Sequence, residues 1–228
     1  GSSIQPCDKI VGVDLPGERR TELDPVAPVV PRGRDGWESY RQPPIPEAVY
    51  LDDEGAVIHY GSRWGMARPP EWAYSQEVHP QRWLPLLDVA NALITHLEVS
   101  FEVSARRDGD TVTYNPPDGC APLRIQIDTQ NVAVRVWAGT ALASCFPGCG
   151  CDACDDDVLD VIDGLEKWVA AVTSARCTER FDGRVLTTST PDGTSEGQVE
   201  RKERKQLREL FDHAPKKWSP WPPRIDWS

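Results

Sequence analysis

The hydrophobic positions of the chain follow two different periods, and the change between them predicts the order of the elements. From Pro80 to Leu97, apolar residues recur every three or four positions, which predicts an amphipathic helix. A second stripe of this kind follows Asp155 and runs to about Ser174, and we expect Asp155 to cap that helix. Between the two stripes, residues 123–127 and 132–137 alternate apolar and polar positions, as strands with one buried face do.

Shorter segments complete the predicted fold. Residues 99–105 and 111–114 are two more predicted strands, and the acidic turn at 52–55 predicts a short hairpin. Residues 183–197 are polar and rich in turn formers, and residues 196–211 predict a short charged helix. This order predicts an α+β fold: an antiparallel sheet of three to five strands, two main helices packed on one face, and long irregular N-terminal and C-terminal segments.

The first part of the chain differs in composition from the rest. It contains many prolines, glycines and charges, with only short apolar groups, and such a segment buries too little surface to offset its chain entropy. We therefore expect an extended or flexible N-terminal arm over residues 1–39 and a single α+β domain over residues 40–228. The domain contains a cysteine-rich loop at 145–154.

Charge and hydropathy exclude some classes of protein. The 228 residues include 25 Lys plus Arg and 36 Asp plus Glu, which gives a formal net charge of −11 and argues against a general nucleic-acid binder. No apolar run approaches the roughly 18 residues that a membrane span needs. The N-terminus also lacks the basic and apolar regions of a secretory signal. We expect an acidic, soluble, cytoplasmic protein with neither nucleic acid nor membrane as its partner.

The cysteine-rich loop carries the clearest chemical signal. Four of the seven cysteines fall in ten residues: Cys145, Cys149, Cys151 and Cys154. The last three form a Cys-x-Cys-x-x-Cys pattern, whose tight spacing lets several sulfurs converge on one cation, with Gly148 and Gly150 allowing the backbone turns. Thiolates favour zinc, or less readily an iron–sulfur cluster, over magnesium or calcium. We predict a zinc site in which Cys145 is the nearest fourth donor.

Other donors can reach the same site through the fold. The candidates are Cys120, Cys177, His59, His79 and His96.

Three alternatives to a structural zinc site stay open. Cys151 and Cys154 form a Cys-x-x-Cys, the spacing of thiol–disulfide oxidoreductases. Asp152 and the acidic run 155–157 disfavour a free thiolate but favour a bound cation, and no parallel βαβ pattern surrounds the motif. A zinc-dependent enzyme with an open ligand position is the second alternative, and a metal-free interaction module is the third. The sequence favours a non-enzymatic metal-binding or interaction domain.

Nine tryptophans are many for this length. The tryptophan-rich loops before residue 84 and the Trp/Pro tail at 218–228 can bind a protein partner, because rigid aromatic rings concentrate binding energy. They can also clamp loops onto a small sheet through their large apolar area, which is the interpretation we favour. The prolines of the tail predict an extended segment across the body of the domain.

Several motifs together resemble an actinobacterial family of unknown function, domain family 6226. They are Tyr-Gly-Ser-Arg-Trp-Gly at 60–65, His-Pro-Gln-Arg-Trp-Leu-Pro-Leu at 79–86, Cys-Gly-Cys-Asp-Ala-Cys at 149–154 and the closing segment 218–224. The resemblance spans about residues 50–224 and implies a bacterial cytosolic protein, without implying an activity. Cys145 is not part of the family's pattern, so the resemblance does not support it as the fourth ligand.

Overall fold

The computed structural model of the chain describes residues 36–213 and 217–224. Most of the predicted arm at 1–39 and the end of the predicted tail lie outside the described residues. No helix within the described ranges is both long and apolar enough to cross a membrane.

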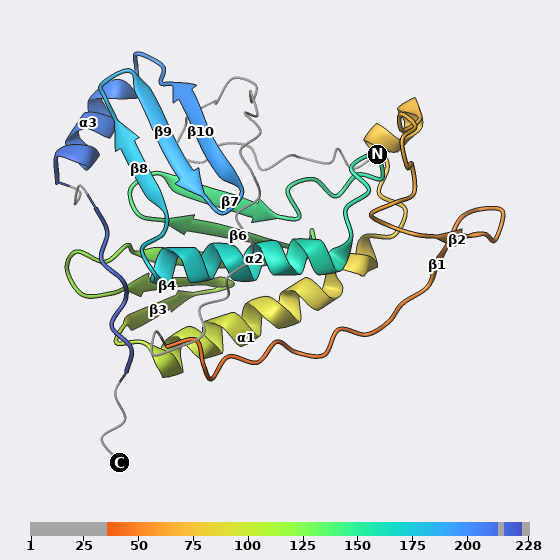
Figure 1. Cartoon of the computed structure of the whole chain (residues 1–228), viewed down its shortest axis with the longest axis horizontal. Coiled ribbons are helices and arrows are strands. Elements are labelled where there is room, and N and C mark those ends of the chain that lie inside the picture. Colours follow the sequence, from red (N-terminus) through yellow and green to blue (C-terminus); the bar gives the residue numbers. More distant parts are fainter. Residues whose placement is uncertain (1–35, 214–216, 225–228) are drawn as a thin grey trace.

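The centre of the fold is a five-stranded antiparallel sheet with the strand order β3-β4-β5-β6-β7 (Figure 1). Its strands are β3 (Ser104–Asp108), β4 (Thr111–Asn115), β5 (Leu123–Asp128), β6 (Ala133–Ala138) and β7 (Leu142–Phe146). Each strand pairs with the next along the chain, so the sheet is a meander. Leu123, Ile125 and Val136 are buried on one face, as the alternating pattern predicts.

Two long helices cover that face. Helix α1 (Leu84–Ser100) contacts β5 and β6, and α2 (Val158–Thr173) contacts β7 and α1 (Figure 1). A 3₁₀ turn, η2 (Pro80–Trp83), precedes α1. Pro85 lies in the first turn of α1, where its missing N–H has no intrahelical partner to lose. The α+β prediction, with both main helices on one sheet face, is confirmed.

The predicted strand at 99–105 is wrong in its first half. Helix α1 continues through Val99 and Ser100, and Phe101 ends it by donating its N–H to the Leu97 carbonyl at 3.2 Å. The apolar alternation of Val99, Phe101 and Val103 resembles a strand, but Val99 is 65% exposed on the helix and Phe101 is buried in the core. The actual strand β3 is an exposed edge strand whose position follows from its pairing with β4.

A second, smaller sheet includes most of residues 183–197, the polar segment rich in turn formers in which the sequence pattern predicted no strands. Strands β8 (Thr178–Phe181), β9 (Val185–Thr190) and β10 (Gly193–Gln198) pair antiparallel in the order β10-β9-β8. Helix α3 (Arg204–His213) contacts β8. Their core is small, with Leu186, Val199 and Leu207 at its centre, so these strands carry too few apolar residues to show a period of two.

The predicted hairpin at the acidic turn is confirmed. It consists of β1 (Tyr50–Leu51) and β2 (Val57–Ile58). The Asp52 carboxylate closes the turn by accepting the N–H groups of Glu54 and Ala56 at 3.0 and 2.8 Å. An irregular segment with one 3₁₀ turn, η1 (Glu71–Ser75), then leads back to α1.

Two buried tryptophans from the ends of the described chain complete the main core. The Trp37 indole donates to the Thr173 hydroxyl at 2.9 Å, and the Trp221 indole donates to the Ala121 carbonyl at 2.8 Å. The backbone N–H of Trp221 donates to the Thr173 carbonyl at 2.8 Å. Residues 217–224 therefore lie extended across the body, which agrees with the clamping interpretation.

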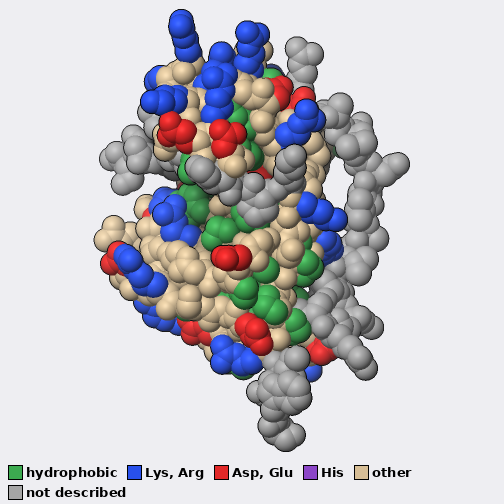
Figure 2. All heavy atoms as spheres, turned by 90° about the vertical axis from the view of Figure 1, so that its left-hand side faces the viewer, with side chains coloured by type: hydrophobic (Ala, Val, Ile, Leu, Met, Phe, Trp, Pro, Cys, Tyr) green, Lys and Arg blue, Asp and Glu red, His purple; other side chains and the backbone are tan. Residues whose placement is uncertain are grey.

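Figure 2 shows that Lys and Arg side chains gather over α3, where Lys205 and Arg208 are exposed.

Candidate metal centre

Three sulfur atoms converge in the loop between β7, the last strand of the large sheet, and α2. The Sγ atoms of Cys149, Cys151 and Cys154 all lie within 4.8 Å of one another. Cys149 Sγ is 3.1 Å from Cys151 Sγ, which is 3.6 Å from Cys154 Sγ. All three are free thiols. Zinc–sulfur bonds of about 2.3 Å in a tetrahedron set neighbouring sulfurs about 3.8 Å apart, so the cluster is close to the size that one zinc ion needs.

Cys145, the fourth predicted donor, does not join this group. It lies in β7, where it pairs with Arg135 on β6, and it is disulfide-bonded. A disulfide sulfur has no thiolate charge to offer a metal. The loop proper therefore begins at Pro147, and its three remaining cysteines form the described cluster.

The other predicted donors also lie elsewhere. Cys120 donates its thiol to the Pro220 carbonyl at 3.3 Å, and Cys177 is buried in the main core. His79 Nε2 lies 3.0 Å from the Leu51 carbonyl oxygen. His96 packs against the rings of the core, and His59 is exposed. None of these side chains belongs to the sulfur group.

The irregular segment before α1 fixes the backbone of the cysteine loop. The N–H groups of Asp152 and Ala153 donate to the carbonyls of Gln76 and Ala73 at 2.8 and 3.1 Å. The Trp64 indole donates to the Asp152 carbonyl at 2.9 Å. Residues 64–76 thus hold the chain between Cys151 and Cys154 from outside the loop.

Asp152 is the buried anchor of this contact. Its side chain is fully buried and forms an ion pair with Arg82, whose Nη1 lies 3.3 Å from Oδ1. Arg63 Nη1 lies 3.9 Å from Oδ2, and the Val78 N–H donates to the same oxygen at 3.3 Å. Arg82 also donates to the Gly150 carbonyl at 3.2 Å. One guanidinium group therefore bonds both the Cys-x-Cys and the Cys-x-x-Cys halves of the motif.

Aromatic rings shield both guanidinium groups. The Arg82 carbon Cζ lies 4.0 Å from the centre of the Tyr60 ring and 4.4 Å from that of Trp83. Arg63 lies over Trp64 at 4.5 Å. Cation–π contacts of this kind help to compensate a buried cation for its lost hydration. The tryptophans of this segment thus belong to the support of the cysteine loop.

The predicted helix cap at Asp155 is wrong, because Asp157 caps α2. The Asp157 carboxylate accepts the Leu159 N–H at 2.7 Å. Asp155 has a left-handed backbone with φ of 54°, and its carboxylate accepts the Arg63 N–H at 2.7 Å. The first aspartate of the run thus binds the supporting segment and the third caps the helix.

Gly150 has a different role from the one predicted. Neither Gly148 nor Gly150 has a positive φ, so neither is required by a left-handed turn. A Cβ at position 150 would lie 2.6 Å from Oε1 of Glu77. The absence of a side chain thus lets a carboxylate approach the backbone between Cys149 and Cys151.

The thiols differ in acidity and in exposure. Burial raises the pKa of the Cys149 and Cys154 thiols, and at Cys154 the thiols of Cys151 and Cys149 raise it further. Burial opposes ionisation of Cys151 as well, but hydrogen bonds from the Cys149 thiol and the Cys154 N–H outweigh it and lower its pKa. Cys151 is only 4% exposed, whereas Cys154 is exposed. The most readily ionised sulfur is therefore the least accessible one.

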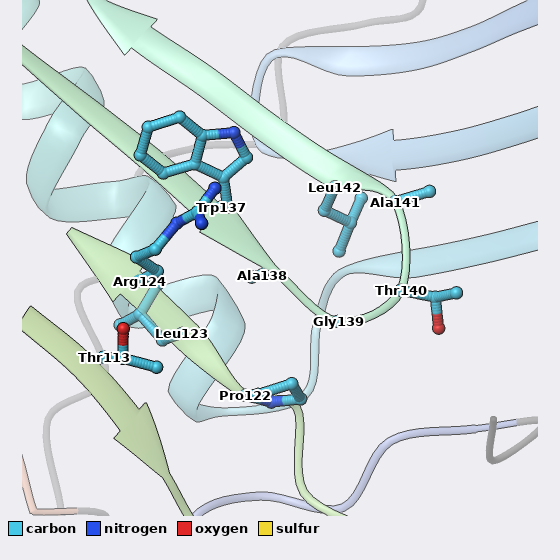
Figure 3. A pocket seen from close by; sticks show the side chains of 10 residues that line it. All are labelled: Thr113, Pro122, Leu123, Arg124, Trp137, Ala138, Gly139, Thr140, Ala141 and Leu142. Atoms are coloured by element: carbon cyan, nitrogen blue, oxygen red, sulfur yellow. The ribbon is translucent and has the colours of Figure 1, made fainter. Parts of the chain in front are cut away.

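A cavity of about 260 Å³ lies away from the cysteines, on the other face of the large sheet (Figure 3). It is lined by Thr113, Arg124 and Trp137, which are cross-strand neighbours, and by the turn between β6 and β7. The Arg124 guanidinium lies 3.9 Å above the Trp137 ring. This cavity contains none of the predicted metal ligands.

The three converging cysteines are predictable from the sequence, but the residues that support them are not. Arg63, Glu77 and Arg82 are separated from the loop by about 70 to 90 positions in the chain. No local pattern connects such distant residues. The one available signal is the Arg-Trp pair, which occurs at 63–64 and again at 82–83.

Comparison with known proteins places the chain in a family. No curated protein and no solved structure matches it. The model of a family of unknown function, DUF6226, matches residues 46–225, which include the irregular segment, both long helices, the large sheet and the cysteine cluster. The match covers most of the chain, and the protein belongs to the DUF6226 family.

Proposed function

We propose that this protein is a zinc-binding domain in which the ion fastens the cysteine loop at the junction of the large sheet and α2. The observation that carries the proposal is the convergence of three free thiols within 4.8 Å. A four-iron cluster sets its cysteine sulfurs further apart, because each thiolate binds a different iron. A single thiophilic ion suits this spacing better.

The charges around the loop also support a bound cation. The carboxylates of Glu77, Asp152 and Asp156 lie close enough to Arg82 to interact electrostatically with it. Three additional unneutralised thiolates would repel these carboxylates, whereas a divalent ion among the sulfurs would reduce the repulsion. Metal binding and complete deprotonation of the thiols are therefore coupled.

The decisive experiment combines metal analysis with a count of reactive thiols. Protein purified without chelator should contain about one zinc per chain, and removing the ion should increase the number of titratable thiols by three. Cys151→Ser should lose the bound metal, whereas Cys120→Ser, which changes a free thiol outside the cluster, should keep it. Metal-free native protein that also fails to bind added zinc would end the proposal.

A thiol–disulfide oxidoreductase that uses Cys151 and Cys154 is the second candidate, favoured by the distance of 3.6 Å between their Sγ atoms. Against it, a reactive cysteine needs both a lowered pKa and access to its substrate, and here Cys151 has the first while Cys154 has the second. A Cys151→Ser variant that folds normally but loses a disulfide-reducing activity of the wild type would establish this alternative.

The segment that supports the loop also presents apolar surface, and we propose it as the contact for a protein partner. Met66 is fully exposed, and Trp72 and Tyr74 are 44% and 53% exposed. The three side chains belong to one short segment of the chain, and exposed apolar side chains are a feature of interaction sites. A metal-free interaction module would use the same surface, and the metal analysis above distinguishes the two.

A further inference from the structure

The three sulfurs leave one position of a tetrahedral zinc ion to be filled. Structural zinc sites take four protein ligands, and the sulfur group contains three within the described parts of the chain. The candidates for the fourth ligand are the carboxylates and imidazoles packed around the loop.

Glu77 presents its carboxylate to the middle of the motif. Measured from the position that a Cβ of Gly150 would occupy, Oε1 lies at 2.6 Å, Cδ at 3.0 Å and Oε2 at 3.3 Å. Gly150 separates two of the three cluster cysteines, so this carboxylate packs directly against the backbone that carries their side chains. A side chain at position 150 would prevent the approach.

One oxygen of this carboxylate is already held in place. The Trp83 indole donates to Oε1 at 2.9 Å. Metal-binding carboxylates are commonly oriented by such an outer hydrogen bond. Within residues 36–213 and 217–224, Oε2 makes no hydrogen bond.

Two of the competing donors are engaged elsewhere. Asp152 is paired with Arg82, and both ring nitrogens of His79 have partners in Leu51 and Gln81. Asp155 has one buried oxygen without a hydrogen-bond partner, but its other oxygen is held at 2.7 Å by the Arg63 N–H. Asp155, which lies next to Cys154, is therefore the alternative fourth ligand that the experiment below must distinguish from Glu77.

We propose that the Glu77 carboxylate supplies the fourth zinc ligand. Glu77 is outside the group whose ligand atoms lie within 4.8 Å of one another. Ligation by Glu77 therefore requires its carboxylate to come closer to the sulfurs when the ion binds. This inference rests on the proposed zinc site and completes its ligand set as three sulfurs and one oxygen.

Cobalt(II) in place of zinc tests the ligand set, because its visible spectrum depends on the donor atoms. Glu77→Gln keeps the shape of the side chain and should shift the spectrum and weaken zinc binding about ten-fold or more. Glu77→Cys should increase the sulfur-to-cobalt charge-transfer absorption, as a fourth thiolate would. Asp155→Asn is the matched control and should leave the spectrum unchanged. Circular dichroism of each variant verifies its fold.

The outcomes separate this inference from the proposed function. If the wild type binds no cobalt or zinc, both fail. If it binds the ion and Glu77→Gln has the wild-type spectrum and affinity, the site stands and Glu77 is not a ligand. A change in the Asp155→Asn spectrum with none in Glu77→Gln would assign the fourth position to Asp155 instead.

Discussion

Gly150 is a glycine whose importance comes from its neighbour rather than from its own backbone angles. Its φ is negative or extended, but a Cβ would meet the Glu77 carboxylate at 2.6 Å. Real Cβ atoms do not approach other atoms so closely, so the carboxylate or the loop must move when any side chain is introduced.

Gly150→Ala should therefore lower the free energy of unfolding by about 0.5–1.5 kcal/mol, because the added methyl group pushes the Glu77 carboxylate away from its hydrogen bond with Trp83. The same substitution should cost much less in a Glu77→Ala background, where the opposing carboxylate is gone. Urea denaturation of the four proteins with a chelator present measures this coupling without a contribution from bound metal. Equal losses in both backgrounds would show that the two residues do not clash.

The buried ion pair between Arg82 and Asp152 should be costly to break from either side. Arg82→Met leaves a fully buried carboxylate without its closest cation, and such changes cost about 3–5 kcal/mol. The double variant with Asp152→Asn should lose less than the sum of the two single losses. Denaturation curves of the single and double variants provide the comparison.

Arg107→Ala is the control for that experiment. It removes a partner from an exposed ion pair with Glu98, and surface pairs contribute about 0–1 kcal/mol. A loss at Arg82 no greater than the loss at Arg107 would contradict the structural role of the buried pair.

Individual residues were predictable only where the signal is local. Cys149, Cys151 and Cys154 are found from sequence because a spacing of two and three residues by itself brings sulfurs together. Arg82 and Glu77 were missed because their contacts with the loop depend on the tertiary fold. Cys145 fits the spacing equally well, but its strand pairing with β6 places it outside the sulfur group.

Among the elements, α2 has an N-cap whose exact position could not be predicted from the local sequence. Three consecutive aspartates precede the helix, and each is a good N-cap by residue type. The Asp155 carboxylate accepts the Arg63 N–H, and it is the Asp157 carboxylate that caps the helix. The sequence predicts that the helix is capped in this run, while a distant residue decides at which position.

Asp157→Ala should lower the free energy of unfolding by about 1 kcal/mol, the usual cost of losing an N-cap. Asp156→Ala, one residue earlier in the same acidic run, should have a smaller effect because Asp156 does not cap the helix. Thermal unfolding of the two variants under identical conditions gives the comparison. A larger loss at Asp156 would contradict the assigned cap.

The strands divide into those the sequence pattern identifies and those it does not. In β5 and β6, buried and exposed positions alternate because one face packs on α1 and α2. The strands β8 to β10 pack on a much smaller core. Their pairing depends on backbone hydrogen bonds that any residue can make, so hydropathy alone did not predict them.

At the scale of the whole molecule, the main core is closed by residues from both ends of the described chain. Trp221 is 2% exposed and contacts the rings of Phe101 and Tyr114. The α+β class, the two main helices and the extended tail were predicted from composition and periodicity. The second sheet was not, because nothing in its polar segments indicates where they pack.

Trp221→Ala should lower the free energy of unfolding by about 3–5 kcal/mol, because a large cavity replaces a fully packed ring. Trp72→Ala should cost less, since that ring is 44% exposed. Chemical denaturation monitored by circular dichroism avoids relying on tryptophan fluorescence, which both substitutions change. Equal losses would indicate that the tail adds little to the core.

Trp221 follows all the helices and strands of the described chain, and this order has a consequence for protein synthesis. A ribosome releases residues in order, and a domain whose interior is filled by residue 221 cannot finish folding while that residue is still inside the exit tunnel. Until then the rings of Phe101 and Tyr114 lack the indole that packs against them, and a chain terminated before residue 221 would keep them uncovered.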